Sequence, residues 1–350
     1  MLVAKGGCRV TVSTTTADGK NELPVFKKTP KMVDGVEVYY FPRWTGDHSQ
    51  FSPALLGWLW QNVRRFDAVH IHSWWNITVL FSVAVCALRG VRPALAPRGM
   101  LSPFTITGRF KPVFHRFFGK FLLKKTFLHA TSEQERQECL ALIPDWPNAN
   151  LPNLLDIPAT GFFQKKQPVT GPLNLLFLSR IHQKKGLELL FGALATAPFD
   201  WKLAIAGDGE AGYIEQLKNF TQKLGIATRI DWLGWVGAGE RLAVFRAADL
   251  MVLPSHNENF ANVVIESLAA GTPVLVSRHV GLSDYVLEKK LGWVCDTTAE
   301  SIGETLAAAA SQAAERARIS AACAAQVRAD FDPAVLVEKY ISMYLELRLD

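Results

Sequence analysis

Short apolar runs alternate with longer stretches of helical spacing along the first 150 residues of the 350-residue chain. The runs typical of strands are Arg9–Ser13, Val36–Phe41, Ala68–His72, Ala94–Ala96 and Phe127–Ala130. The stretches typical of helices are Pro53–Arg65, Ile77–Leu88, Arg109–Lys124 and Ser132–Ala141. Strands that alternate with helices in this way predict a parallel sheet with helices on both faces.

A segment rich in proline, glycine and polar residues, Leu151–Gly171, is typical of a linker between two domains. The alternation then resumes, with apolar runs at Leu173–Leu178, Leu250–Leu253, Pro273–Val276 and Leu291–Val294. An alanine-rich helical stretch follows to Ala329, and Asp332-Pro333 suits the cap and first turn of another helix. We therefore expect an α/β chain of two doubly wound domains, 1–160 and 161–332, with a last helix over 333–350.

Length and composition agree with this organisation. A chain of 350 residues exceeds one ordinary core, and 49% hydrophobic with 20% charged residues is typical of a folded globular protein. Five cysteines are scattered, odd in number and without metal-ligand spacing, which favours reduced thiols in the cytosol. No secretory signal precedes Gly6, and no apolar run reaches the roughly 20 residues that cross a bilayer, so we expect a cytoplasmic protein.

The net charge of +6 is unevenly distributed. Residues 1–150 hold 19 Lys and Arg against 10 Asp and Glu, a balance of +9 that leaves −3 for the rest. A basic half suits an anionic partner or simply keeps the protein soluble. Its basic residues are interleaved with apolar positions and form no recognised nucleic-acid module, so we expect no nucleic-acid partner.

The most basic stretch, 109–125, has an amphipathic pattern. One face carries the apolar residues Phe110, Val113, Phe114, Phe117, Phe118, Phe121 and Leu122, and Lys and Arg occupy the rest. Such a helix suits the anionic inner face of a cell membrane, to which the protein would bind peripherally. The same pattern equally fits a helix that packs its aromatic face into the domain core, so the residues leave both interpretations open.

The densest group of polar residues follows the apolar run Leu250–Leu253. The stretch 254–266 reads as strand end, polar loop and helix start, which places it at the carboxyl edge of a parallel sheet, where ligands bind. A helix start there offers backbone N–H groups around Phe260, Ala261, Asn262 and Val263 to a diphosphate. Two carboxylates flank them, Glu266 placed for a ribose diol and Glu258 for the group beyond the phosphates. The same residues also fit an ordinary helix with an Asn cap and an acidic first turn.

The spacing from Glu258 to Glu266, with Asn-Val-Val-Ile between them and Ala-Ala-Gly-Thr-Pro-Val after, resembles the nucleotide-sugar site of retaining glycosyltransferases of family 4. Three other segments agree with that family in the same order, namely 177–186, 206–209 and 232–235. The resemblance covers nearly the whole chain and is strongest from about 173 to 295. It implies the GT-B fold, in which two Rossmann-like domains face a cleft and the C-terminal helix crosses back to the first domain.

The resemblance also implies roles for the residues of the second domain. Arg180 and Lys185 would neutralise the departing diphosphate, and such stabilisation of developing charge is usually the largest catalytic contribution. Glu266 would bind the ribose, and Glu258 the hydroxyl groups of the donor sugar. Close backbone approach is expected at Gly207 and Gly209, and main-chain groups at Leu233 and Trp235 would read the base. The family needs no divalent metal, and we expect no cofactor.

Two residues of the first domain are expected at the site. His72 ends its predicted strand, on the same side as His70, and the family places a histidine there to contact the sugar. A histidine that satisfies a buried backbone group is the competing interpretation. Arg98 follows the next strand, where its guanidinium would bind a phosphate or an acceptor carboxylate, or would brace the loop.

The beginning of the chain departs from the family pattern. Leu2–Lys5 is typical of the last turn of a helix stopped by Gly6 and Gly7. The family usually has a first central strand, a glycine-rich loop and most of a helix before this turn, and the resemblance implies that they are absent here. We therefore expect an unfilled position in the first sheet. The absent loop would normally approach the donor phosphates or the acceptor, so its absence bears on activity.

The expected reaction is transfer of a hexosyl group from a UDP- or GDP-sugar to a glycan or lipid-linked acceptor, with retention of the anomeric configuration. The family's usual work suggests surface polysaccharide biosynthesis. Two alternatives of the same architecture remain. A sugar-nucleotide epimerase would produce free sugar without an acceptor, and a non-catalytic nucleotide-sugar-binding protein would bind donor without turnover.

Overall fold

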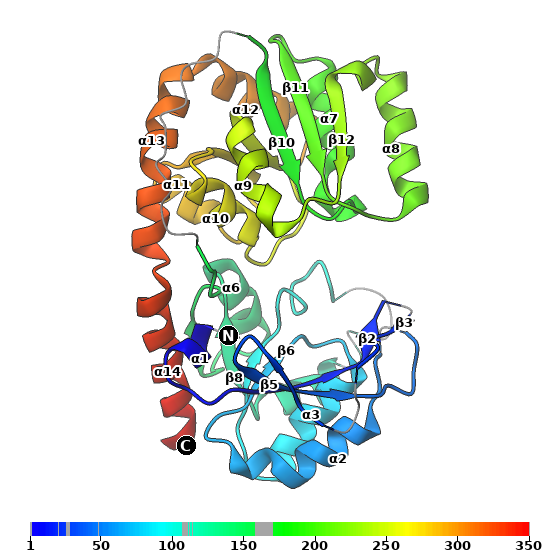
Figure 1. Cartoon of the computed structure of the whole chain (residues 1–350), viewed down its shortest axis with the longest axis vertical. Helices are drawn as coiled ribbons and strands as arrows, with labels where there is room; N and C mark the ends of the chain where they lie inside the picture. The colour runs from blue at the N-terminus through cyan, green and yellow to red at the C-terminus, as the bar shows by residue number, and fades with distance from the viewer. Residues whose placement is uncertain are drawn as a thin grey trace. The chain divides into compact units, whose positions relative to one another are not determined.

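The computed structural model describes residues 2–349 except 20, 26–28, 48, 107–110, 112, 114 and 158–170. The chain divides into two compact units. Unit 1 comprises residues 1–156 and 333–350, and unit 2 comprises residues 157–332 (Figure 1). Most of the expected linker, from 158 to 170, lies outside the described residues.

Unit 2 is built on one six-stranded sheet in which every pairing is parallel. Its strands are β10 (Leu173–Leu178), β11 (Trp201–Ala206), β12 (Ile230–Gly234), β13 (Leu250–Leu253), β14 (Val274–Ser277) and β15 (Gly292–Cys295). Their order across the sheet is β12-β11-β10-β13-β14-β15. The central strands β10, β13 and β14 consist almost entirely of buried apolar residues, as expected for strands covered on both faces.

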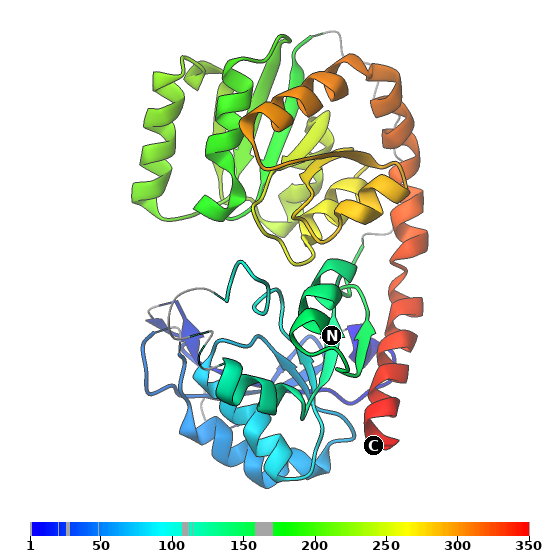
Figure 2. The same cartoon turned by 180° about the vertical axis from the view of Figure 1, so that it is seen from behind.

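Helices cover both faces of this sheet (Figures 1 and 2). They are α7 (Leu187–Ala195), α8 (Ala211–Lys223), α9 (Ala238–Ala247), α10 (Asn262–Ala269), α11 (Ser283–Glu288), α12 (Ala299–Ser311) and α13 (Ala313–Asp330). Short 3₁₀ turns add η3 (Gln183–Lys185) and η4 (Ala227–Arg229). α7 and α12 pack together, and α10 packs against α13. Unit 2 is therefore a doubly wound domain, as the sequence predicts.

Unit 1 contains two main sheets. One pairs β1 (Thr11–Thr15), β5 (Val36–Phe41) and β4 (Lys31–Val33), with β4 antiparallel. The other is parallel and ordered β6 (His70–His72), β7 (Ala94–Ala96), β8 (Phe127–Ala130) and β9 (Asn148–Asn150). Among the described residues, β1 and β6 each end their sheet. No described strand joins these two edges, which agrees with the unfilled position expected in the first sheet.

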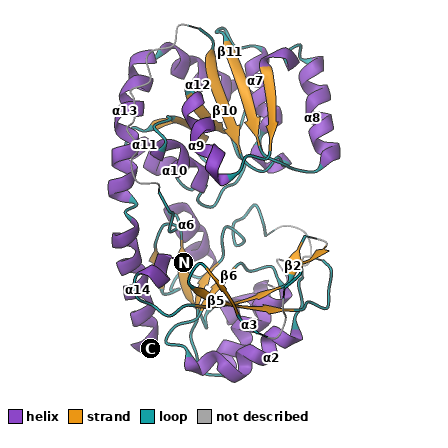
Figure 3. Ribbon diagram, viewed as in Figure 1, coloured by secondary structure: helices purple, strands orange, loops and turns teal. Residues whose placement is uncertain are grey.

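The helices of unit 1 begin with α1 (Leu2–Lys5), which ends at Gly6 and Gly7 as expected. They continue with α2 (Pro53–Asn62), η1 (Val63–Arg65), α3 (Ile77–Leu88), the π turn η2 (His115–Gly119), α5 (Lys120–Leu123) and α6 (Glu133–Leu142). The last helix, α14 (Pro333–Leu349), belongs to this unit and packs against α1. Figure 3 distinguishes these helices from the strands by colour. No helix of the described residues has the length and apolar character to span a membrane.

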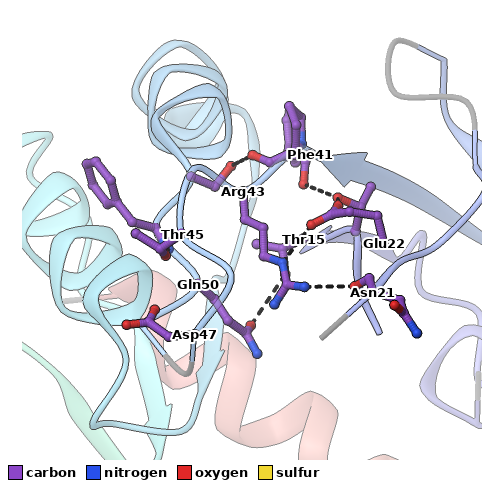
Figure 4. Close-up of polar contacts among 12 residues, drawn as sticks. Thr15, Asn21, Glu22, Phe41, Arg43, Thr45, Asp47 and Gln50 are labelled. Atoms are coloured by element: carbon purple, nitrogen blue, oxygen red, sulfur yellow. Dashed lines mark hydrogen bonds and ion pairs between the residues drawn. The ribbon is translucent and has the colours of Figure 1, made fainter. Parts of the chain in front are cut away.

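A small hairpin closes the carboxyl ends of β1 and β5. It consists of β2 (Ala17–Asp18) and β3 (Asn21–Glu22), paired antiparallel. Arg43 holds it down, donating to the carboxylate of Glu22 at 2.6 Å and to the carbonyl of Asn21 at 2.7 Å (Figure 4). Beside it, Thr15 donates to the side chain of Gln50 at 3.3 Å. These contacts fix the edge of the small sheet.

Candidate functional site

The strand order of unit 2 has its topological switch point between the neighbouring strands β10 and β13. From β10 the chain first fills the sheet in one direction, through β11 and β12, and then in the other, through β13, β14 and β15. Ligands of doubly wound sheets bind at this switch point, outside the carboxyl ends of the strands. The loops that leave β10 and β13 carry Lys185 and Glu258, two of the residues predicted for the site.

A glycine brings these two loops into direct contact. Gly186 has a φ of +72°, and a Cβ at this position would lie 2.3 Å from the carbonyl oxygen of Pro254. The backbone N–H of His256 also donates to the carbonyl of Lys184 at 2.8 Å. Only glycine fits this close approach, so the sequence Lys185-Gly186 aligns the two loops.

Lys185 and Glu258 form an ion pair between the loops. The side chains are 8% and 14% exposed, so both charges are largely removed from water. Burial holds the pKa of Lys185 below its ordinary value, while the charge of Glu258 acts in the opposite direction. A buried cation beside a carboxylate at a sheet edge can neutralise an anionic leaving group and orient a hydroxyl group.

The loop after β14 fixes the backbone of Glu258. Its N–H donates to the carbonyl of His279 at 2.9 Å, and its carbonyl accepts from Gly281 at 2.8 Å. These two hydrogen bonds form a parallel β-bridge between Glu258 and Val280. The loop after β14 therefore fixes the backbone that carries the Glu258 carboxylate. We did not expect His279 or Gly281 at the site, because their backbone contacts leave no signal in residue type.

The helix α10 begins at the expected position but with a different cap. Ala261 is the N-cap in a left-handed conformation, with a φ of +66°, and Asn262 is the first helical residue. The alternative of a helix with an Asn cap and an acidic first turn is therefore wrong, because the cap is an alanine and the first turn holds no acidic residue. Phe260 is buried and packs edge-on against Phe331, with ring centroids 6.1 Å apart. This buried ring anchors the turn that leads to the backbone N–H groups of Asn262 and Val263.

Glu266, one turn into α10, pairs with an arginine that we did not predict. Arg241 of α9 donates to its carboxylate at 3.2 Å, and the guanidinium carbon lies 6.0 Å from the ring centroid of Trp235. Trp235 is 72% exposed and Leu233 is 46% exposed, both at the carboxyl end of β12. Trp235, Arg241 and Glu266 therefore form a continuous group at the edge of the sheet.

Gly207 and Gly209 lie in close contact with backbone carbonyl groups of the loop after β10. A Cβ on Gly207 would lie 1.8 Å from the carbonyl oxygen of Ser179, and one on Gly209 would lie 2.2 Å from that of Ile181. Both contacts hold the loop after β10. Arg180, in this loop, is exposed, and its charge contributes to the lowered pKa of Lys185. The predicted donor contacts of these two glycines remain predictions.

In unit 1, His72 and Arg98 come together. Arg98, which has a φ of +57°, donates to the side chain of Asn153, and its second terminal nitrogen lies 3.3 Å from Nδ1 of His72. The rings of His70 and His72 are 4.3 Å apart, so the expectation that they share one side of the strand is confirmed. Arg98 thus braces the ends of β6 and β9, and its acceptor role remains a prediction.

A chain of polar contacts continues from this pair to the last helix. His70 contacts the hydroxyl of Tyr344 at 2.9 Å and the ring of His129 at 3.1 Å. The hydroxyl of Tyr340 lies 3.2 Å from His129 and donates to the carbonyl of Pro152 at 3.0 Å. Burial lowers the pKa of His72 and of His129 to about 4 and that of His70 well below its ordinary value.

These histidines make the stability of unit 1 sensitive to acid. Their folded pKa values lie below the ordinary 6.5, so the unfolded chain takes up protons first and stability falls as the pH drops from about 6.5 to about 4. The slope is about 1.4 kcal/mol per pH unit for each proton. Thermal unfolding followed by circular dichroism should show this fall, with a smaller slope in His129→Gln. An unchanged slope in that variant would show that other groups control it.

The loop of Arg98 rests on a buried carboxylate that the sequence did not reveal. Glu135, 3% exposed, accepts from the backbone N–H of Gly99 at 2.7 Å and from the N–H and hydroxyl of Thr131 at 2.9 and 3.0 Å. It lies in the first turn of α6, whose cap is Ser132. The carboxylate therefore ties the end of β7 to the end of β8.

Replacing Glu135 by alanine leaves three buried donors without an acceptor. We expect a loss of about 3–5 kcal/mol in the free energy of unfolding, and a smaller loss for Glu135→Gln, which keeps one acceptor oxygen. Glu133→Ala is the matched control, because Glu133 lies in the same turn but its ion pair with Arg136 is exposed and should contribute less than about 1 kcal/mol. Urea unfolding measures all three. Equal losses for Glu135→Ala and Glu133→Ala would disprove the anchoring role.

Two family models match the chain, one to each unit. Residues 2–153 match the glycosyl transferase 4-like domain, and residues 160–325 match glycosyl transferases group 1. Among curated relatives, the D-inositol 3-phosphate glycosyltransferase of Corynebacterium diphtheriae is 34% identical over 129 residues. That match covers 35% of this chain and 30% of the relative, so the chain is aligned with about a third of such a protein.

Solved structures match over far more of the chain. Sucrose-phosphate synthase from Thermosynechococcus elongatus superposes with a TM-score of 0.76 over 99% of this chain and 90% of its own, at 18% identity. The Anabaena protein HepE, solved with UDP and glucose, gives a TM-score of 0.71 over 88% of this chain and 86% of its own, also at 18% identity. These likenesses show the GT-B fold, as expected from the sequence. With both units matched to glycosyl transferase models, the chain belongs to the glycosyltransferases, pairing a 4-like domain with a group 1 domain.

Proposed function

We propose that the chain is a retaining glycosyltransferase that moves a hexosyl group from a UDP- or GDP-sugar to a glycan or lipid-linked acceptor. The observation that carries this proposal is the buried Lys185–Glu258 pair at the β10/β13 switch point, beside the start of α10. Unit 2 then holds the donor, and unit 1 contributes His72 to contact the sugar and Arg98 to contact the acceptor. The UDP bound to the HepE structure supports a nucleotide-sugar donor.

Different residues of unit 2 bind different parts of the donor. The diphosphate lies at the N–H groups of Asn262 and Val263, with Arg180 and Lys185 as counter-charges. Glu266 accepts from the ribose hydroxyls once Arg241 moves aside, and the β12 end around Leu233 and Trp235 receives the base. Glu258 accepts from hydroxyl groups of the sugar. The ion pair holds the two side chains next to each other, so that Lys185 can contact the diphosphate while Glu258 contacts the sugar.

In the reaction, the bond between the anomeric carbon and the diphosphate oxygen breaks, and the acceptor oxygen bonds to the same face of that carbon. The acceptor proton passes to the departing phosphate oxygen. Lys185 and Arg180 stabilise the negative charge that develops on this oxygen, which lowers the barrier to departure. We propose that this chemistry needs no divalent metal and no cofactor.

We further propose that the enzyme acts in surface polysaccharide biosynthesis, in the cytoplasm and at the inner face of the cell membrane. A lipid-linked acceptor has to be reached at a membrane surface, although no described helix crosses one. We propose no nucleic-acid partner.

The test is a transfer assay with UDP-glucose and GDP-mannose as probes and a bacterial membrane lipid extract as acceptor source. We expect nucleoside diphosphate to be released together with a lipid whose mass has grown by one hexose. Nuclear magnetic resonance of the product should show retained anomeric configuration, and excess EDTA should leave the rate unchanged. Free sugar in the absence of acceptor would instead indicate an epimerase, and donor binding without any product would indicate a non-catalytic binding protein.

A further inference from the structure

The segment that leads into β8 exposes large aromatic side chains. Phe117 and Phe118 of the π turn η2 are 67% and 64% exposed, and Phe121 of α5 is 64% exposed. Val113 and Phe104 are 56% and 51% exposed. The sequence allowed this aromatic face to pack into the core, but the structure places these residues at the surface. Phe110 and Phe114 lie outside the described residues.

The opposite side of the same segment already provides its packing. His115, Gly119 and Leu123, spaced four residues apart, are buried, and Leu123 belongs to the main hydrophobic core of unit 1. α5 also packs against α3. This buried side attaches the segment to its unit, and exposed aromatic groups of this size indicate an interaction surface.

Basic residues accompany these aromatic residues along the segment, which contains no acidic residue. Lys120, Lys124 and Lys125 are exposed, and the ammonium of Lys125 lies 5.8 Å from the ring centroid of Phe121. In the sequence, no Asp or Glu occurs between Asp67 and Glu133, while nine Lys and Arg do. A partner that fits must be apolar at its centre and negatively charged around it.

We propose that Phe117, Phe118, Phe121 and the three lysines form a surface that docks onto an anionic phospholipid bilayer. The aromatic rings enter the boundary between headgroups and acyl chains, and the lysines contact the lipid phosphates. The inference deepens the proposed function, on which it rests for the lipid-linked acceptor, by naming the residues and the lipid charge that hold the enzyme at its membrane.

The test is co-sedimentation of the full chain with vesicles of phosphatidylcholine alone or with about a third phosphatidylglycerol. We expect binding only to the anionic vesicles, weaker at 0.5 M salt because salt screens the lysines. Phe117→Ser/Phe121→Ser should lower the partition constant at least about tenfold, since both rings leave the bilayer. Replacing the three lysines by glutamine should lower it about fivefold per charge.

Matched controls distinguish binding through this surface from nonspecific adsorption to vesicles. Met32→Ser, which replaces another exposed apolar residue of unit 1, and the triple change of Lys202, Lys218 and Lys223 to glutamine in unit 2 should leave vesicle binding unchanged. Calorimetric binding of UDP and GDP by every variant checks folding and the donor site separately. Lost vesicle binding with intact nucleotide binding therefore concerns the surface alone.

Three outcomes would overturn the inference. They are failure of the wild-type chain to bind anionic vesicles, equal binding to neutral vesicles, and unchanged binding by the phenylalanine variant. Size-exclusion chromatography adds a fourth, because a dimer that Phe117→Ser/Phe121→Ser dissociates would assign the surface to a second copy of the chain. Failure of nucleotide binding with intact vesicle binding would instead contradict the proposed function and leave the docking surface standing.

Discussion

Replacing Lys185 by alanine is expected to lower the rate of glycosyl transfer by about a hundredfold to a thousandfold. The change removes the buried cation that faces the departing diphosphate, and it leaves the carboxylate of Glu258 without its counter-charge. The rate should be measured at saturating donor, with urea unfolding to separate a catalytic effect from a loss of folded protein. Glu258→Gln is expected to lower the rate as well, because a neutral amide accepts more weakly from a sugar hydroxyl.

Lys184→Ala is the matched control for Lys185→Ala. Lys184 is the preceding residue, is less buried, and uses its backbone carbonyl to bind His256, a contact that alanine keeps. Its removal takes one positive charge from the same loop and should change the rate by less than about threefold, as for a solvated surface charge. Similar losses in the two variants would mean that only the loop's net charge matters, and the specific role of the Lys185–Glu258 pair would then be rejected.

Gly207→Ala is expected to prevent stable folding of unit 2. The new Cβ would lie 1.8 Å from the carbonyl oxygen of Ser179, and the residue has a φ of +149°, which side chains rarely adopt. The backbone of both loops would have to move, at a cost above about 4 kcal/mol, beyond the usual range of single substitutions. Thermal unfolding and solubility of the purified chain measure this effect.

Gly212→Ala provides the comparison for Gly207→Ala. Gly212 lies in the first turn of α8, and its added Cβ would meet only a flexible Glu210 oxygen at 3.8 Å. Because alanine favours helices over glycine by up to about 1 kcal/mol, this variant should be as stable as the wild type or slightly more stable. A Gly207→Ala protein that unfolds at the wild-type temperature would show that the two loops are not packed as described.

The sequence was most informative about unit 2, because its strands are long buried apolar runs and its site residues follow them directly. The motif around Glu258 and Glu266 places both carboxylates near one sheet edge, and the structure agrees. It does not predict that Lys185 binds Glu258, since that contact depends on how Gly186 packs against Pro254. Contacts between loops depend on backbone geometry that residue type alone does not specify.

Unit 1 was harder to predict. The strands Asn21–Glu22 and Asn148–Asn150 consist mainly of short polar residues, so they lack the alternation that marks a strand. Glu135 resembles an ordinary acidic residue of a first helical turn, and only the structure shows it buried beneath two loops.

Arg241 is a further site residue that the sequence alone does not reveal. It lies within a helix, where an arginine usually faces water, and no motif distinguishes it. Its contacts to Glu266 and Trp235 arise because the carboxyl end of β12 and the helices α9 and α10 meet in the folded unit. Pairings between elements that are distant in sequence therefore require the structure.

The central claim is that unit 2 binds a nucleoside diphosphate at the β10/β13 switch point, and calorimetric titration with UDP and GDP tests it most directly. We expect that one of the two nucleotides binds and that Arg180→Ala and Glu266→Ala each weaken binding at least about tenfold, as loss of a charge-assisted contact does. Glu215→Ala, on the exposed side of α8, should bind like the wild type. A well-folded chain that binds neither nucleotide, or variants that bind as tightly as the wild type, would contradict the claim.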